Sequence, residues 1–114
     1  MVKPRQTVMY CHKIKDEKLP AGFRYYHFAM HPKITALYDS AENPVFKVLV
    51  KEIKEEKDSY WGWWDNSKKQ FNFVYYAKSL VEMCFPYGSK IKEKHGKGHV
   101  LPVSIEVLED KVKS

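Results

Sequence analysis

The chain has 114 residues, 15% of them aromatic, and its 20 basic side chains outnumber 14 acidic ones, so the net charge is +6. This length predicts one domain, residues 1–114, that can bury a core without disulfides or metals. A basic balance permits contact with nucleic acid, nucleotides or an acidic protein face without requiring any of them. No apolar run approaches the roughly 18 residues of a membrane span, and the N-terminus lacks the apolar core of a signal peptide, so we expect a cytoplasmic protein.

The first thirty residues predict a hairpin. Side chains alternate with a period of two along residues 6–14 and again along residues 23–30, which is the period of a strand. The charged segment between them carries the turn formers Pro20 and Gly22. Both faces of the second strand carry aromatic rings. This predicts a sheet that is covered on both sides, or covered on one side and exposed on the other.

Two further strands are predicted before the tryptophans. Residues 34–38 fit a short strand, residues 39–44 a loop, and residues 45–53 a strand rich in Val and Ile. Residues 51–58 form a run of mixed charge. We interpret this run as a solvated strand end and loop.

Residues 60–88, YWGWWDNSKKQFNFVYYAKSLVEMCFPYG, contain all three tryptophans, and we expect the rest of the fold to be arranged around them. Large side chains stand on both faces of residues 60–65, and a period of two continues through residues 71–78. The polar segment at residues 65–69 is rich in turn formers. The pattern predicts a strand, a tight turn and a second strand. A helix is the alternative for the second strand, because its apolar residues also fit helical spacing.

A short helix is predicted after this hairpin. Ser79 and Glu82 have the spacing of a capping box and precede an apolar run. Pro86 and Gly88 would end the helix, because proline cannot continue the hydrogen-bond ladder and glycine tolerates a reversed backbone.

The last part of the chain predicts a second short helix and a final strand. Residues 89–98 fit a helix capped by Ser89 and closed by Gly96, and residues 99–108 alternate as a strand. Pro102 lies within that strand. It favours an edge position or an irregular start, since proline lacks the N–H that a central strand needs.

The predicted elements together indicate an α+β fold. We expect a mostly antiparallel, twisted sheet of five to seven strands, or a partial barrel, with one or two short helices packed on one side. The ends, residues 1–5 and 109–114, are polar and are expected to be frayed.

The strongest candidate for a contact surface is an aromatic and basic one. Tyr60 and Tyr75 belong to the same ribbon of rings. Its predicted contact residues are Trp61, Trp63, Trp64, Tyr76, Lys68 and Lys69. Three interpretations stay open: packing in the core, anchors of a protein interface, or a platform on which nucleic-acid bases or nucleotide rings stack.

The glycine loop near the C-terminus is a candidate anion site. Glycines let backbone N–H groups approach an anion, and nearby cations favour it. The segment lacks the spacing of a phosphate-binding P-loop, and an ordinary exposed turn is the more common explanation of such a segment. The predicted anion-binding residues are Lys94, Gly96, Lys97, Gly98 and Arg24.

Histidines and cysteines give no motif of known chemistry. His27 and His31 stand four residues apart, as do His95 and His99, but neither pair has the flanking pattern of a metal motif. Cys11 beside His12 would point to the opposite face of a strand, so the two would not form a catalytic pair, and Cys84 lies in an apolar run, where a thiol is inert. We expect reduced thiols and assign no catalytic residue, metal or cofactor.

The segment YWGWWDNSKKQFNFVYYAKSLVEMCFPYG, about a quarter of the chain, resembles segments of small bacteriophage-encoded proteins of uncharacterised function. The features it shares are the YWGWW ribbon, the Asp-Asn turn and VEMCFPYG. The resemblance implies a viral accessory protein that acts in the bacterial cytosol by binding a host or defence component, and it carries over no catalytic residue. The sequence therefore favours a small binding protein that does not act on a membrane. A nucleic-acid or nucleotide-binding module is the alternative, and an enzyme is less favoured than either.

Overall fold

The computed structural model describes residues 4–32, 45–83 and 98–112, and in this part of the chain antiparallel strands dominate. The predicted hairpin of the first two strands and the predicted hairpin across the polar turn at residues 65–69 are both present. The elements are β1 (Gln6–Lys15), β2 (Phe23–Ala29), β3 (Val45–Glu52), β4 (Tyr60–Asp65), β5 (Gln70–Tyr75), α2 (Lys78–Glu82) and β6 (Gly98–Val112).

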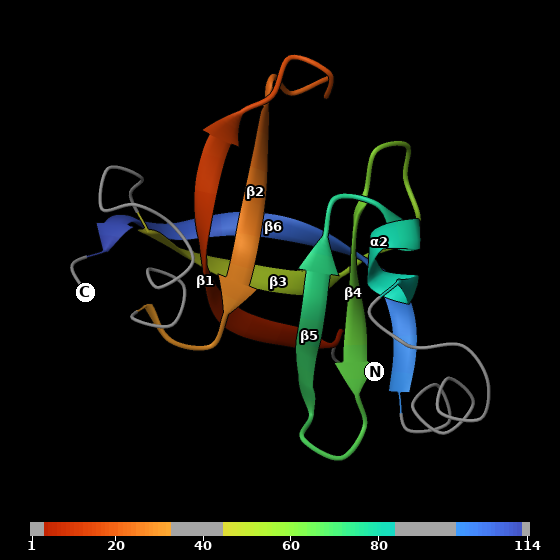
Figure 1. Cartoon of the computed structure of the whole chain (residues 1–114). Coiled ribbons are helices and arrows are strands. Elements are labelled where there is room, and N and C mark those ends of the chain that lie inside the picture. The colour runs from red at the N-terminus through yellow and green to blue at the C-terminus, as the bar shows by residue number, and fades with distance from the viewer. Residues whose placement is uncertain (1–3, 33–44, 84–97, 113–114) are drawn as a thin grey trace.

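The six strands form one sheet in the order β2-β1-β3-β6-β4-β5, and every neighbouring pair is antiparallel. The sheet curls so far that its two edge strands, β2 and β5, lie side by side (Figure 1). The predicted partial barrel is confirmed in this coarse sense. The α+β class holds only loosely, because one five-residue helix accompanies the sheet in the described residues.

The long strand β6 joins the two halves of the barrel. Its first part pairs with β4 and its second part pairs with β3. Pro102 lies where the two pairings meet: it faces Trp61 of β4, and its carbonyl accepts the N–H of Ile53 at 3.1 Å. The predicted edge position is therefore wrong. The expected fraying is also wrong for residues 109–112, because β6 continues through them and Val112 pairs with Val45.

Side-chain hydroxyls cross the seam between β2 and β5, where no strand ladder is formed. The hydroxyl of Thr7 on β1 accepts the N–H of Phe71 on β5 at 2.8 Å. The hydroxyl of Tyr60 on β4 accepts the N–H of Tyr25 on β2 at 2.9 Å. Each bond satisfies a backbone donor of an edge strand, which would otherwise have no ladder partner there.

Two apolar clusters cover the two faces of β4. Trp64 and Phe71 pack edge to face inside the barrel, with ring centroids 5.0 Å apart. Trp63 lies on the other face, where it packs with Val81 of α2. The barrel interior buries Trp64 and the helix α2 covers Trp63, so two consecutive tryptophans on opposite faces of one strand are both buried.

The helix α2 begins two residues earlier than the capping box predicted. Its N-cap is Ala77, and no side chain caps it, so the predicted reciprocal bonds of Ser79 and Glu82 are wrong. A helix of this length gains little from its own hydrogen bonds. The fully buried Val81 explains why it forms against the sheet.

Some predicted elements lie outside the described residues. They are the strand at residues 34–38 and, except for Gly98, the helix at residues 89–98. No helix in the described ranges is long and apolar enough to cross a membrane.

The first prediction concerns Gly98, which pairs with Asp65 of β4. A Cβ atom added there would collide with the carbonyl oxygen of Trp64 and lie 2.6–2.7 Å from the indole of Trp63. We expect Gly98→Ala to lower the free energy of unfolding by about 1–3 kcal/mol, the range for overpacking. Urea denaturation measures this loss.

The matched control is Gly22→Asn. Gly22 has a φ of 81° and open space around it, and asparagine tolerates this backbone region. Equal losses in the two variants would contradict the close packing of Gly98 against the tryptophans.

The second prediction tests the Thr7 bond. Thr7→Val keeps the shape of the side chain but leaves the buried N–H of Phe71 without its acceptor. We expect a loss of about 1–3 kcal/mol of stability and faster hydrogen exchange at Phe71. Thr7→Ser keeps the hydroxyl and should retain slow exchange there; rapid exchange in Thr7→Ser as well would show that the hydroxyl does not protect this amide.

Candidate functional site

Two of the predicted contact residues belong to the core. Trp63 is 6% exposed and Trp64 8% exposed, so neither offers a ring to another molecule, and that part of the prediction is wrong. The reason is the cover on both faces of β4. The alternative of core packing, which the sequence left open, applies to these two rings.

The other two predicted rings are half-buried and already face cations of the protein. The Lys78 ammonium lies 5.2 Å from the ring centre of Trp61, and the Arg24 guanidinium lies 5.2 Å from that of Tyr76. Arg24 also contacts the carboxylate of Asp16 at 3.6 Å. A carboxylate and an aromatic face thus already engage its charge, and its role in an anion site stays a prediction.

The predicted glycine loop is only partly described. Lys94, Gly96 and Lys97 lie outside the described residues. Gly98 is described and packs closely against the two buried tryptophans, and its part in anion binding stays a prediction.

Lys68 and Lys69 are exposed in the turn between β4 and β5, as predicted. Asp65 holds this turn: its Oδ1 accepts the N–H of Ser67 at 2.9 Å and that of Lys68 at 3.1 Å. Slight burial opposes ionisation, but these hydrogen bonds outweigh it and lower the pKa of Asp65. The carboxylate is thus charged at neutral pH and fixes where the two lysines emerge.

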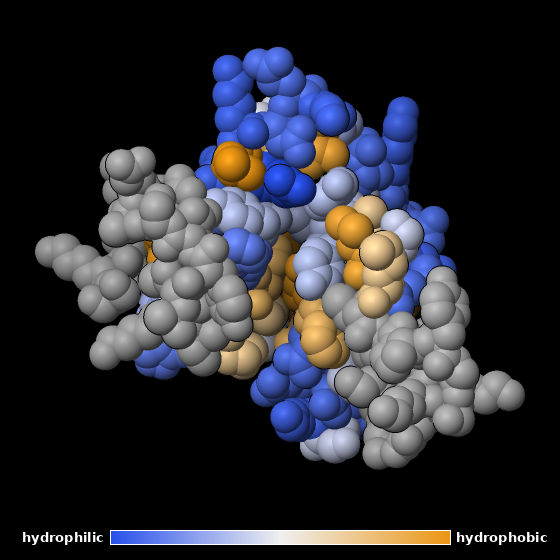
Figure 2. All heavy atoms as spheres, in the orientation of Figure 1, coloured by the Kyte–Doolittle hydropathy of each residue, from blue (hydrophilic) through white to orange (hydrophobic). Residues whose placement is uncertain are grey.

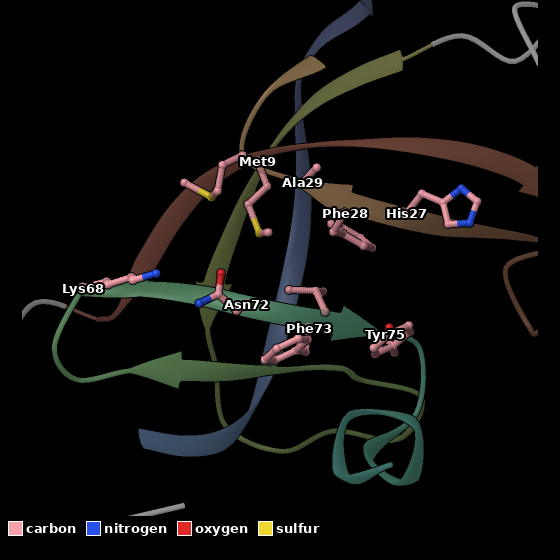
Figure 3. Close-up of a pocket in the computed structure, with 10 residues that line it drawn as sticks. Met9, His27, Phe28, Ala29, Lys68, Asn72, Phe73 and Tyr75 are labelled. Carbon is pink, nitrogen blue, oxygen red and sulfur yellow. The ribbon is translucent and has the colours of Figure 1, made fainter. Parts of the chain in front are cut away.

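A cavity lies between the edge strands, and we call it the seam groove. It is an open groove of about 600 Å³ with mostly apolar walls. Figure 2 shows hydrophobic residues gathered on this face between β2 and β5, and Figure 3 shows Phe28 and Phe73 on facing strands. Its lining residues are Met9, His27, Phe28, Ala29, Met30, Lys68, Asn72, Phe73, Val74 and Tyr75.

Both walls of the seam groove carry the same irregularity. The register of β2 against β1 gains one residue between Tyr26 and Ala29, and that of β5 against β4 gains one between Asn72 and Tyr75. Within these bulges His27 has a φ of 53° and Phe73 a φ of 56°. A bulky residue in the left-handed region is rare and strained, and such bulges redirect side chains.

The bulges turn large apolar side chains outward into the seam groove. Met30 is 42% exposed, and Phe73 and Tyr75 are each 37% exposed. The sequence identified Tyr75 as part of the aromatic ribbon but gave no contact role to Phe73 or Met30. Regular alternation would have placed Phe73 with Phe71 on the inside, so only the bulge, which period-two reasoning does not show, brings it out.

The polar groups of the seam groove are basic or neutral. Among the described lining residues, Lys68, His27, Asn72 and the hydroxyl of Tyr75 contribute them, and none of these residues carries a carboxylate. In the described ranges, no three His, Cys, Asp or Glu side chains gather into a metal site. The seam groove can therefore make apolar contacts with a ligand, and Lys68 can contact a negative charge on it.

Cys11 and His12 are both buried, at 0% and 1% exposure. The His12 ring packs 5.5 Å from Tyr26 and 6.2 Å from His27, measured between ring centres. Cys11 is a free thiol in the barrel core. A thiol enclosed in this way is a poor nucleophile.

The third prediction uses this thiol. Burial raises the pKa of Cys11 from 9.0 to about 12. The unfolded thiol thus loses its proton first, and the stability linked to it is complete below pH 9 and falls as the pH rises toward 12. We expect the urea midpoint to drop above pH 9 and Cys11→Ala to lessen that drop. An identical pH dependence in the variant would exclude Cys11 as its source.

Comparisons with protein-family models, with curated proteins and with solved structures found no significant match. The resemblance of residues 60–88 to small bacteriophage proteins therefore stays a prediction. Function has to be inferred from the seam groove and from the charges around it.

Proposed function

We propose that this protein is a binding protein that takes an apolar segment of a partner protein into its seam groove. One observation carries the proposal: three large apolar side chains, Met30, Phe73 and Tyr75, are each more than a third exposed in a single groove of about 600 Å³. Full burial of a side chain of this size is worth roughly 1.5–3 kcal/mol. A few such anchors dominate the energy of a protein interface.

Charge favours an acidic flank on the partner segment. Lys68 lines the seam groove, Lys69 follows it in the turn, and the net charge of the chain is +6. Facing charges of opposite sign raise association rates and fix orientation. The partner segment would therefore carry large apolar side chains beside Asp or Glu.

The bulges favour anchoring by side chains over the addition of a regular strand. An edge strand with a bulge does not present an even row of N–H and C=O groups. His27 and Phe73 each interrupt one wall of the seam groove in this way. The strain they hold is typical of functional sites, where surrounding structure maintains it.

The phage resemblance favours a host or defence protein of the bacterial cytosol as the partner. The alternative of nucleic-acid or nucleotide binding has less support, because the described rings proposed for stacking are buried or face the protein's own cations. The two functions differ in salt dependence, since contacts with phosphates weaken steeply as salt rises.

The fourth prediction separates function from stability at Phe73. Phe73→Asn removes the ring but suits the left-handed backbone, whose strain for other residues is about 1–2 kcal/mol. This relief offsets the loss of ring contact with Trp63, whose centre lies 6.1 Å away. We expect the free energy of unfolding to change by less than about 1 kcal/mol, while capture of the partner from bacterial lysate is lost.

Leu108→Glu is the matched control, because Leu108 is 49% exposed and lies outside the seam groove. It should capture the same partner as the natural chain, in moderate salt and after nuclease treatment. Capture that disappears with nuclease would support the nucleic-acid alternative. Capture that Phe73→Asn retains in full would place the contact surface elsewhere.

A further inference from the structure

A second cavity, of about 290 Å³, has walls that combine aromatic rings with aliphatic side chains. Four of its lining residues are Phe23, Tyr25, Tyr60 and Tyr76, and Asp58 is the charged one among the described residues that line it. It shares no lining residue with the seam groove. We refer to it as the aromatic cavity.

The rings of the aromatic cavity are steeply inclined to one another. Phe23 and Tyr25 meet at 78° with centres 5.2 Å apart, and Tyr25 and Tyr60 meet at 53° with centres 6.1 Å apart. Rings at such angles form separate walls of one enclosure. The face of an aromatic ring is electronegative, so several faces around one space attract a cation.

The protein's own cations show that these rings attract positive charge. The Lys13 ammonium lies 4.1 Å from the ring centre of Phe23, and the Arg24 guanidinium lies over Tyr76. Neither Lys13 nor Arg24 lines the aromatic cavity. These two cations therefore do not fill the space inside the aromatic cavity.

Two walls are fixed before any ligand arrives. The Tyr60 hydroxyl accepts the N–H of Tyr25 at 2.9 Å, and Tyr25 is only 8% exposed. Burial raises the pKa of both phenols, so the hydroxyls stay neutral at physiological pH. A site formed in advance loses less entropy on binding.

Asp58 gives the aromatic cavity its charge. Its carboxylate is exposed, and its backbone has a φ of 67°, in the left-handed region. One carboxylate among apolar rings suits a cation that needs few hydrogen-bond acceptors. A methylated ammonium group meets that need, because methyl groups replace its N–H donors, whereas a bare lysine ammonium would lose hydration without full compensation.

We propose that the aromatic cavity binds a methylated ammonium group. The group is either the side chain of a trimethylated lysine in a protein or a free quaternary amine. The proposal goes beyond the seam groove and stands or falls independently of it, since the two cavities have different walls.

The test is a titration of isotope-labelled protein, followed by the amide signals of Tyr25, Asp58 and Tyr60. Three probes are compared: a short peptide with Nε-trimethyl-lysine, the same peptide with the nitrogen replaced by carbon, and choline. We expect the charged peptide to bind about ten-fold more tightly than its neutral isostere. Tighter binding of the peptide than of choline points to a protein side chain, and the reverse order to a free amine.

Variants locate the binding. Tyr76→Leu keeps an apolar wall without its ring, and Asp58→Asn removes the charge while tolerating the left-handed backbone. Each should weaken binding of the charged peptide several-fold, whereas Tyr75→Leu in the seam groove should leave it unchanged. Equal binding of the neutral isostere, no binding of any probe at millimolar concentration, or full binding by a folded Asp58→Asn and Tyr76→Leu would overturn the proposal.

Discussion

The barrel depends on two hydroxyl groups that take the place of a strand ladder. Where β2 and β5 meet, the hydroxyls of Thr7 and Tyr60 accept the N–H groups of Phe71 and Tyr25 from inside. The edge strands are thereby held near each other without being paired along their length. A complete ladder would have closed the barrel, and no groove would remain between β2 and β5. Fold and candidate site thus follow from the same incomplete closure.

The sequence predicted most of the strands because their side chains alternate, and alternation is the direct record of a sheet with two different faces. It also showed that two faces carried rings. The sequence did not show which of those rings are buried. Whether Trp63 meets solvent depends on α2, whose position is fixed by Val81 and not by a cap. The sequence predicted a short helix here, but not its start, its lack of a side-chain cap or its packing against Trp63.

The candidate site was the less predictable part, since it arises where alternation fails. A bulge adds one residue to a strand and so reverses which face the following side chains occupy. Phe73 lies at such a point, and its neighbour Phe71 is fully buried while Phe73 is 37% exposed. The residue type does not indicate the bulge, because phenylalanine rarely adopts a positive φ and so would not be predicted at such a position. Lys68, by contrast, was predicted correctly as an exposed turn residue, since Asp65 and its neighbours have ordinary turn chemistry.

The two cavities are linked by the strands they share. Strand β2 supplies Phe23 and Tyr25 to the aromatic cavity and His27 to the seam groove, and the consecutive residues Tyr75 and Tyr76 divide between the two. A partner chain that filled one cavity would therefore hold its neighbouring residues near the other. If the same partner also carried a methylated ammonium group at the right spacing, the second contact would be intramolecular and would gain from a high effective concentration. The two proposed sites, each with its own test, would then together select a partner more narrowly than either site alone.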